Sequence, residues 1–230
     1  MFGVARGLGV LEERLVPLPN WANLALVRPV DRPSRFRASL GITEGRRVVL
    51  YTGNLGRKQG VALIGNAARC SQEAGSPVVY VVSGEGADQE ALGSAAVLQG
   101  LTNLLRVPLQ PDESFNELLN LADAHLIVQE AEVADLVMPS KLTNMLASGR
   151  PVIATATAGT ALAELILGQD VGTFVEPGDP VALADAIDAV LGDDESRVRQ
   201  GANARAFAEV YLDRDALLEA ALARMCEQCH

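Results

Sequence analysis

Residues 48–60 have the sequence VVLYTGNLGRKQG, in which a short apolar run ends at a glycine-rich loop that leads into an amphipathic stretch. The apolar run at 48–52 is typical of a strand that is covered on both faces of a sheet. Residues 61–74 then repeat apolar side chains at helical spacing. Such strand and helix pairs recur from about Arg47 onward, and this alternation indicates βα units around a parallel sheet.

The same alternation predicts the remaining elements of an α/β fold. Further strands are expected at residues 78–83, 104–108, 125–128, 152–154 and 172–175. Helices are expected between them at residues 88–92, 113–121, 140–147, 161–167 and 180–191, and then as a helical tail at 195–209 and 214–226. We therefore predict a doubly wound, mostly parallel six-stranded sheet, Rossmann-like, over residues 47–230. Four prolines break residues 1–46 into an entry or linker segment.

Composition excludes several classes of protein. The chain has 230 residues, 49% of them hydrophobic, which is enough for a large core and excludes a disordered chain. A net charge of −10, from 29 acidic and 19 basic residues, argues against a nucleic-acid partner. No apolar run reaches the roughly 18 to 20 residues of a membrane-spanning helix, and the first residues lack the features of a signal peptide. A soluble, cytoplasmic protein is expected.

Cysteine and histidine are too scarce for several kinds of site. Three cysteines do not make a disulfide framework, and two histidines exclude a histidine-rich metal site or a Ser-His-Asp triad. Residues 226–230, CEQCH, match a haem-attachment pattern, but a frayed helical tail is the simpler interpretation. His125 falls in an apolar run and is expected to be a core residue.

In an open α/β sheet, ligands bind beyond the carboxyl ends of the strands, so the loop at residues 53–60 is the first candidate site. Gly53 and Gly56 allow a ligand to approach the backbone closely, Asn54 lies between them, and Arg57 and Lys58 add positive charge. The alternative is an ordinary glycine-rich turn with solvated basic residues. The loop matches neither the Walker motif nor G-x-G-x-x-G.

A second candidate site is the stretch MPSKLTN at residues 138–144. Ser140 suits the N-cap of the following helix, and Lys141 falls in its first turn, where a cation is unfavourable by a few tenths of a kcal/mol. A bound anion would reverse that penalty. Lys58 and Lys141 are the two lysines among 19 basic residues, and we predict that both bind one diphosphate.

The remaining polar loops carry weaker signals. Residues 83–86, SGEG, include Gly84 and are explained equally well by a tight turn. Residues 176–179, EPGD, are expected to form a turn and an N-cap. Glu132 and Asp135 belong to an acidic loop that is solvated by default, although a carboxylate there could contact sugar hydroxyls.

Five strings together resemble the C-terminal, nucleotide-sugar-binding half of GT-B glycosyltransferases of the family-4 type, especially the colanic-acid type of exopolysaccharide biosynthesis. They are VPLPNWAN at 16–23, VVLYTGNLGRKQG at 48–60, VVSGEG at 81–86, ADLVMPSKLTNMLASGRPVIATA at 134–156 and VEPGDPVALADAI at 175–187. The fourth string is the most specific, and the order of the strings covers nearly the whole chain.

The resemblance implies a retaining transfer of a sugar from a nucleoside-diphosphate sugar to a saccharide or lipid-linked acceptor, without a metal or other cofactor. Gly53 and Asn54 would contact the diphosphate through backbone N–H groups, and Lys58 and Lys141 would neutralise it. The substrate-binding residues that it implies are Gly53, Asn54, Gly56, Arg57, Gly84, Val107, Pro108, Leu109, Glu132, Asp135, Ser140 and Asn144. Of these, residues 107–109 would hold the base, and Asn144 would lie near the ribose.

The sequence also departs from that family. Many members carry two glutamates spaced E-x7-E, whereas this chain has Leu136 and Asn144 at those positions. An amide offers one acceptor oxygen where a carboxylate offers two, so weaker contact to the ribose is expected. We expect Glu132 or Asp135 to take the place of the first acid. The N-terminal acceptor domain of such enzymes is absent from this sequence.

Partners and alternatives follow from these departures. A lipid-linked acceptor implies contact with the inner face of a membrane, and a tail from Arg214 that normally crosses to the absent half would expose apolar surface and favour a homo-oligomer. The base and the sugar stay open. A nucleotide-sugar-binding module without catalysis is the main alternative. A nicotinamide oxidoreductase shares the fold class but lacks its glycine fingerprint.

Overall fold

The computed structural model describes residues 6–11, 15–56, 60–87, 92, 100–129 and 138–227. Six parallel strands form one sheet in the order β3-β2-β1-β4-β5-β6, so the strand order reverses direction between β1 and β4. This is the predicted doubly wound, Rossmann-like fold. The strands are β1 (Val48–Thr52), β2 (Val79–Ser83), β3 (Leu104–Val107), β4 (Ala124–Ile127), β5 (Val152–Thr155) and β6 (Gly172–Val175).

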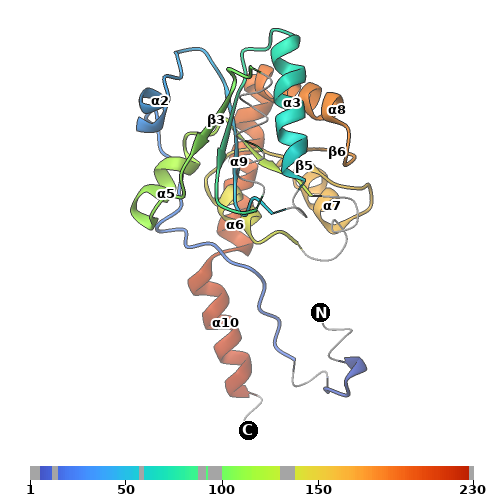
Figure 1. Ribbon diagram of the computed structural model, residues 1–230. Coiled ribbons are helices and arrows are strands. Elements are labelled where there is room, and N and C mark those ends of the chain that lie inside the picture. Colours follow the sequence, from blue (N-terminus) through green and yellow to red (C-terminus); the bar gives the residue numbers. More distant parts are fainter. Residues whose placement is uncertain are drawn as a thin grey trace.

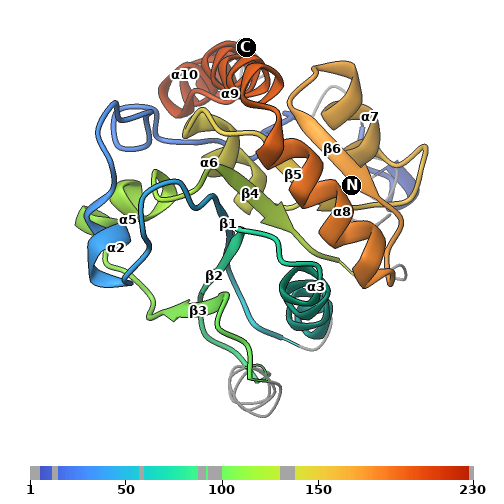
Figure 2. The same ribbon diagram turned by 90° about the horizontal axis from the view of Figure 1, so that it is seen from above.

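Helices cover both faces of the sheet, as Figure 2 shows from above. They are α2 (Arg35–Ser39), α3 (Val61–Glu73), α5 (Asp112–Leu119), α6 (Lys141–Ala147), α7 (Ala161–Gly168), α8 (Pro180–Gly192), α9 (Asp194–Tyr211) and α10 (Arg214–Glu227). The strands are nearly continuous apolar runs because both faces are covered. In β1, Val49 and Tyr51 pack toward α3 and α8, whereas Val48 and Leu50 pack toward the opposite layer.

The strand bounds agree with the sequence prediction to within one residue at each end, and β1 and β6 agree completely. Apolar run length and flanking turn residues fix these short strands well. The helix expected at 88–92 lies outside the described residues apart from Leu92, which is buried against the α3 face.

Residues 22–42, where no element was predicted, pack against the domain. Helix α2 forms there, and the Ser34 hydroxyl accepts a hydrogen bond from the Phe36 N–H at its N-cap. Ala22, Val27 and Ile42 are buried in the clusters on that face of the sheet. The last of the four prolines is Pro33, so they did not prevent a short helix directly after it.

Two capping predictions had different outcomes. Asp179 caps α8 as expected, because its side chain accepts from the N–H groups of Val181 and Ala182. Ser140 occupies the N-cap position of α6 as expected, but its backbone is itself helical and its side chain forms no cap hydrogen bond among the described residues.

His125 is a buried core residue, as predicted. Its Nε2 lies 2.8 Å from the Ser148 hydroxyl, and burial lowers its pKa to about 3, so the imidazole is neutral. Cys226 lies near the end of α10 and is exposed, while Cys229 and His230 fall outside the described residues.

Helix α10 stands apart from the sheet and extends away from it on the side where the chain begins (Figure 1). Its start is tied to the entry segment: Ala22 N–H donates to the Leu212 carbonyl at 2.8 Å, and Arg214 N–H donates to the Ala22 carbonyl at 3.1 Å. Leu222 and Met225 are exposed on it. Within the ranges that the structure describes, no helix has the length and apolar character needed to cross a membrane.

Candidate functional site at the carboxyl end of the sheet

Lys141 lies against the loop that follows β1, although the two are far apart in the sequence. Lys141 is the first residue of α6, in the segment that follows β4, and β4 is the hydrogen-bonded neighbour of β1. A Cβ atom built on Gly53 would lie 3.3 Å from the Lys141 Nζ. Because parallel strands end at the same edge of the sheet, the fold joins the two candidate loops.

The Lys141 ammonium is buried, and none of the described residues supplies a counterion. Its Nζ has no hydrogen-bond partner among the described residues, and it lies 4.1 Å from the centroid of the Tyr51 ring. Burial lowers the pKa of Lys141 to about 8. A cation–π contact offsets part of the desolvation cost, but an ammonium group has three donors that still lack acceptors.

The glycine-rich loops after β1 and β2 hold each other. Gly53 N–H donates to the Ser83 carbonyl at 3.0 Å, and Leu55 N–H donates to the Glu85 carbonyl at 2.8 Å. Gly84 has a φ of 153°, and a Cβ on it would fall 1.8 Å from the Gly53 carbonyl oxygen. Only glycine fits this approach.

One of these hydrogen bonds corrects the expectation for Gly53. Its N–H is already used between the strand ends, so it does not point to a ligand as the resemblance implied. The Asn54 carbonyl accepts from the Tyr51 hydroxyl at 2.8 Å, which fixes this loop over the ring that Lys141 faces.

A pocket of about 330 Å³ opens beside Lys141, and we call it the lysine pocket. It is lined by Asn20, Trp21, Ser140, Lys141, Thr143 and Asn144. The Thr143 hydroxyl donates to the Trp21 carbonyl at 3.1 Å and so ties the entry segment to α6. The pocket thus combines one cation with an indole and neutral hydrogen-bonding groups.

A second pocket, of about 310 Å³, lies at the ends of β2 and β3, and we call it the Pro108 pocket. It is lined by Gly84, Glu85, Arg106, Pro108 and Leu109. The Ser83 hydroxyl donates to the Pro108 carbonyl at 3.2 Å. Gly84 of this pocket packs against Gly53, and Gly53 in turn packs against Lys141 of the lysine pocket.

The predicted site residues fall into three groups. The structure brings together Gly53, Asn54, Gly56, Gly84, Pro108, Leu109, Ser140, Lys141 and Asn144 at the carboxyl end of the sheet. Val107 is not among the residues that line the Pro108 pocket, and its side chain is buried in the core beside α5, so a contact of Val107 with the base stays a prediction. Arg57, Lys58, Glu132 and Asp135 lie outside the described residues, so the pairing of Lys58 with Lys141 stays a prediction.

Sequence reasoning missed Tyr51, Asn20 and Trp21 as site residues. Tyr51 is a buried residue of β1, and no pattern distinguishes it from its apolar neighbours. Asn20 and Trp21 were present in the VPLPNWAN string as a family signal, but their contact with α6 depends on how the entry segment folds back.

The family model for glycosyl transferases group 1 matches residues 34–207 of the chain. The chain belongs to this family. It is 34% identical over 213 residues to WcaI of Escherichia coli K12, a protein named as a colanic acid biosynthesis glycosyl transferase, with 91% of this chain and 51% of that protein covered. This group 1 glycosyl transferase chain spans about half the length of the curated relatives it matches.

Solved structures show the same fold. HepE of Anabaena, crystallised with UDP, superposes with a TM-score of 0.79 at 19% identity and covers 96% of this chain and 60% of its own. The C-terminal domain of a group 1 glycosyl transferase from Francisella tularensis superposes with a TM-score of 0.68 at 18% identity, covering 84% of this chain and 99% of its own.

Proposed function

We propose that this chain binds a nucleoside-diphosphate sugar at the carboxyl end of its sheet and forms the donor-binding half of a retaining glycosyltransferase. The observation that carries the proposal is the buried Lys141 ammonium, which faces the Gly53 loop with no hydrogen-bond acceptor among the described residues. A diphosphate would supply that acceptor, and the protein has already met the cost of desolvating the cation.

The two pockets suit the two ends of such a ligand. The Pro108 pocket offers the apolar Pro108 and Leu109 with polar groups at its side, which suits a nucleobase. The lysine pocket offers the Asn144 amide and other hydrogen-bonding groups, which suits ribose or sugar hydroxyls. HepE, which shares the fold, was crystallised with UDP and with UDP-glucose.

Lys141 would act on the leaving group. When the bond between the sugar and the diphosphate breaks, negative charge builds up on the diphosphate oxygens, and a fixed ammonium in a poorly solvated site stabilises that charge more than the ground state. We expect Lys58 to contribute in the same way, and we expect transfer without a metal or other cofactor.

The acceptor would be bound outside this chain. Its curated relatives are about twice as long, and helix α10 and the described part of the entry segment from residue 15 extend away from the sheet on one side (Figure 1). We expect an N-terminal acceptor domain to pack there and to bind a saccharide or a lipid-linked saccharide at the inner face of a membrane.

Calorimetric titration with GDP, UDP and ADP tests the binding step. One of them should bind, and Lys141→Met should weaken it about tenfold to a hundredfold, as expected for the loss of a charged hydrogen bond of about 1.5–3 kcal/mol. Arg69→Gln is the matched control, because Arg69 is exposed on α3 and pairs only with Glu73 among the described residues. Equal affinities in all three proteins would contradict the proposal.

Transfer itself is tested by adding the acceptor half of a close relative. Product formation in the mixture, with the anomeric configuration of the donor preserved by NMR, supports the retaining enzyme. Tight nucleotide binding without any turnover supports instead a non-catalytic nucleotide-sugar-binding module. That second function is favoured by Asn144, an amide that lines the lysine pocket at a position where many family members have glutamate.

A further inference from the structure

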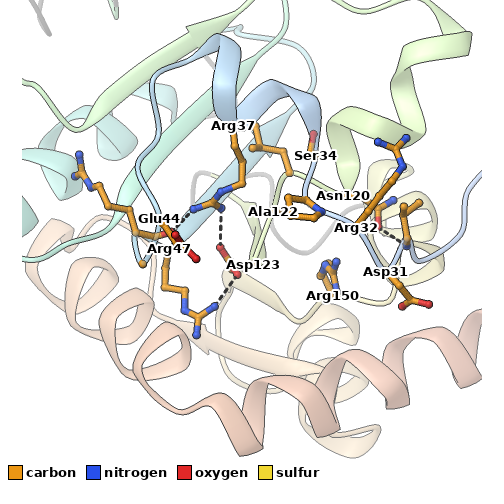
Figure 3. A pocket seen from close by; sticks show the side chains of 15 residues that line it. Asp31, Arg32, Ser34, Arg37, Glu44, Arg47, Asn120, Ala122, Asp123 and Arg150 are labelled. Atoms are coloured by element: carbon orange, nitrogen blue, oxygen red, sulfur yellow. Dashed lines mark hydrogen bonds and ion pairs between the residues drawn. The ribbon is translucent and has the colours of Figure 1, made fainter.

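The largest of the described pockets, about 470 Å³, lies at the opposite end of the sheet from the donor site and is drawn in Figure 3. We call it the arginine pocket. Its residues include Arg47, which precedes β1, Asp123, which precedes β4, and Arg150, which closely precedes β5. Five arginines and three carboxylates line it, in a chain whose net charge is −10. Its volume falls in the range of small-molecule sites, about 300–1,000 Å³.

Four of the five arginines have acceptors of their own. Arg32 pairs with Glu117 at 2.7 Å, and Arg47 pairs with Asp123 at 3.2 Å. Arg46 donates to the Pro77 carbonyl at 2.9 Å. Arg37 donates to main-chain carbonyls of the loop before β1 and lies 3.7 Å from Asp123. These guanidinium groups hold the walls of the pocket in place.

Arg150 is the exception. It forms no hydrogen bond or ion pair with any described residue, and its Nε is buried without a partner. Figure 3 shows its guanidinium group between Asp31 and Asp123 without an interaction line to either. Burial lowers the pKa of Arg150, because the loss of solvent around the guanidinium group disfavours its charged form.

Asp123 does not neutralise this cluster. Its carboxylate accepts the Val48 N–H at 2.8 Å, pairs with Arg47 and lies 3.7 Å from the guanidinium groups of both Arg37 and Arg197. Several cations already share the Asp123 carboxylate, and Asp31, the other carboxylate that acts on Arg150, forms no ion pair with it. A buried charged donor without an acceptor is unfavourable, and an anion in the pocket would remove that cost.

We propose that the arginine pocket binds a phosphate group, either as inorganic phosphate or as a small phosphomonoester, with Arg150 as its principal ligand. A guanidinium group presents planar, paired N–H donors that match two oxygens of a phosphate, and it stays charged at any physiological pH. Arg37 and Arg47 lie across the pocket and add positive potential. The proposal does not rest on the donor site, which is at the other end of the sheet.

The test is an NMR titration of the whole chain with inorganic phosphate at pH 7 and constant ionic strength, following arginine Nε–H signals. The signal that disappears in Arg150→Gln identifies Arg150. In the unmutated protein this signal should shift and saturate with phosphate, and chloride at equal ionic strength should not move it. Glucose 1-phosphate in place of inorganic phosphate distinguishes the phosphomonoester from the free ion.

Variants separate the arginine pocket from the donor site. Arg150→Gln should weaken phosphate binding about tenfold or more, whereas the half-exposed control Arg69→Gln should leave it unchanged. If Arg150→Gln does not fold, Arg150→Lys keeps the charge and removes the paired donors, and it should weaken binding less. An Arg150 signal that phosphate does not shift overturns the proposal, and so does phosphate binding that only Lys141→Met abolishes. Nucleoside-diphosphate affinity is measured separately, so failure of the donor proposal remains distinguishable.

Discussion

Lys141 at the carboxyl end of the sheet faces glycine backbone and an aromatic ring, whereas the arginines at the amino end gather around the carboxylate of Asp123. Among the residues that the structure describes, the first arrangement leaves a buried cation without a counterion, and the second pairs nearly every cation. The two arrangements therefore suit different roles. A charged group that has no partner in the fold is available to a ligand, whereas a charged group that is paired within the fold stabilises the position of the strands. Arg150 lies at the amino end, but like Lys141 it has a buried nitrogen without an acceptor among the described residues.

The largest effect is expected from alanine at two glycines, one at each end. A Cβ on Gly84 would fall 1.8 Å from the Gly53 carbonyl oxygen, and a Cβ on Gly172 would fall 1.8 Å from the Val152 carbonyl oxygen. Because both contacts are with backbone, the neighbouring strand end must move, and each substitution should lower the free energy of unfolding by about 4 kcal/mol. Urea denaturation measures this directly.

Nucleotide affinity then distinguishes the two ends. Gly84→Ala displaces the Gly53 loop that Lys141 faces, so it should weaken nucleoside-diphosphate binding in the fraction that stays folded. Gly172→Ala acts at the start of β6 and should leave the affinity unchanged. Equal loss of affinity in both variants would mean that global stability, and not the carboxyl end, controls binding.

The next largest effect is expected from Asp123→Ala. The substitution leaves Arg47 and Arg197 without a shared carboxylate and removes the acceptor of the Val48 N–H. Breaking a largely buried ion pair by removing one partner should lower the free energy of unfolding by about 3 kcal/mol. Asp185→Ala is the matched control on the exposed face of α8, and it should change the free energy by less than about 0.5 kcal/mol. A similar small change in both variants would contradict the stabilising role of the amino end.

The two ends also differ in how far the sequence predicts them. The carboxyl end was predictable because loops after strands carry special residue types: the glycines of residues 53–60 and the lysine at the start of α6 are visible as patterns. The arginine pocket was not, because Arg37, Asp123 and Arg150 are ordinary surface residue types in unrelated stretches. The pairing of β4 with both β1 and β5 and the packing of α2 bring them together, with Arg37 3.7 Å from Asp123.

Lys141→Met should stabilise the protein at pH 7, whereas the substitutions of Gly84, Gly172 and Asp123 should destabilise it. The pKa of Lys141 falls from 10.5 to about 8 on burial, so below pH 8 the folded state carries the full cost of a buried ammonium. Removing that cost should raise the free energy of unfolding by about 2 kcal/mol. Between pH 8 and 10.5 the unfolded chain binds more protons, so the stability of the unmutated protein rises with pH and the difference should shrink. A destabilised Lys141→Met at pH 7 would mean that the ammonium has an acceptor within the chain.

The smallest effect is expected from pH on nucleoside-diphosphate affinity. In the proposed function only the protonated Lys141 would bind a diphosphate, and in the free protein its pKa is about 8. Affinity should therefore be constant below pH 7 and fall by up to about tenfold per pH unit above 8. Lys141→Arg keeps its charge throughout this range and should flatten the profile. Tyr51, with a pKa raised to about 12 by burial, stays neutral under the same conditions and does not contribute. An identical fall in Lys141→Arg would assign the titration to another group and leave the carboxyl end without its proposed cation.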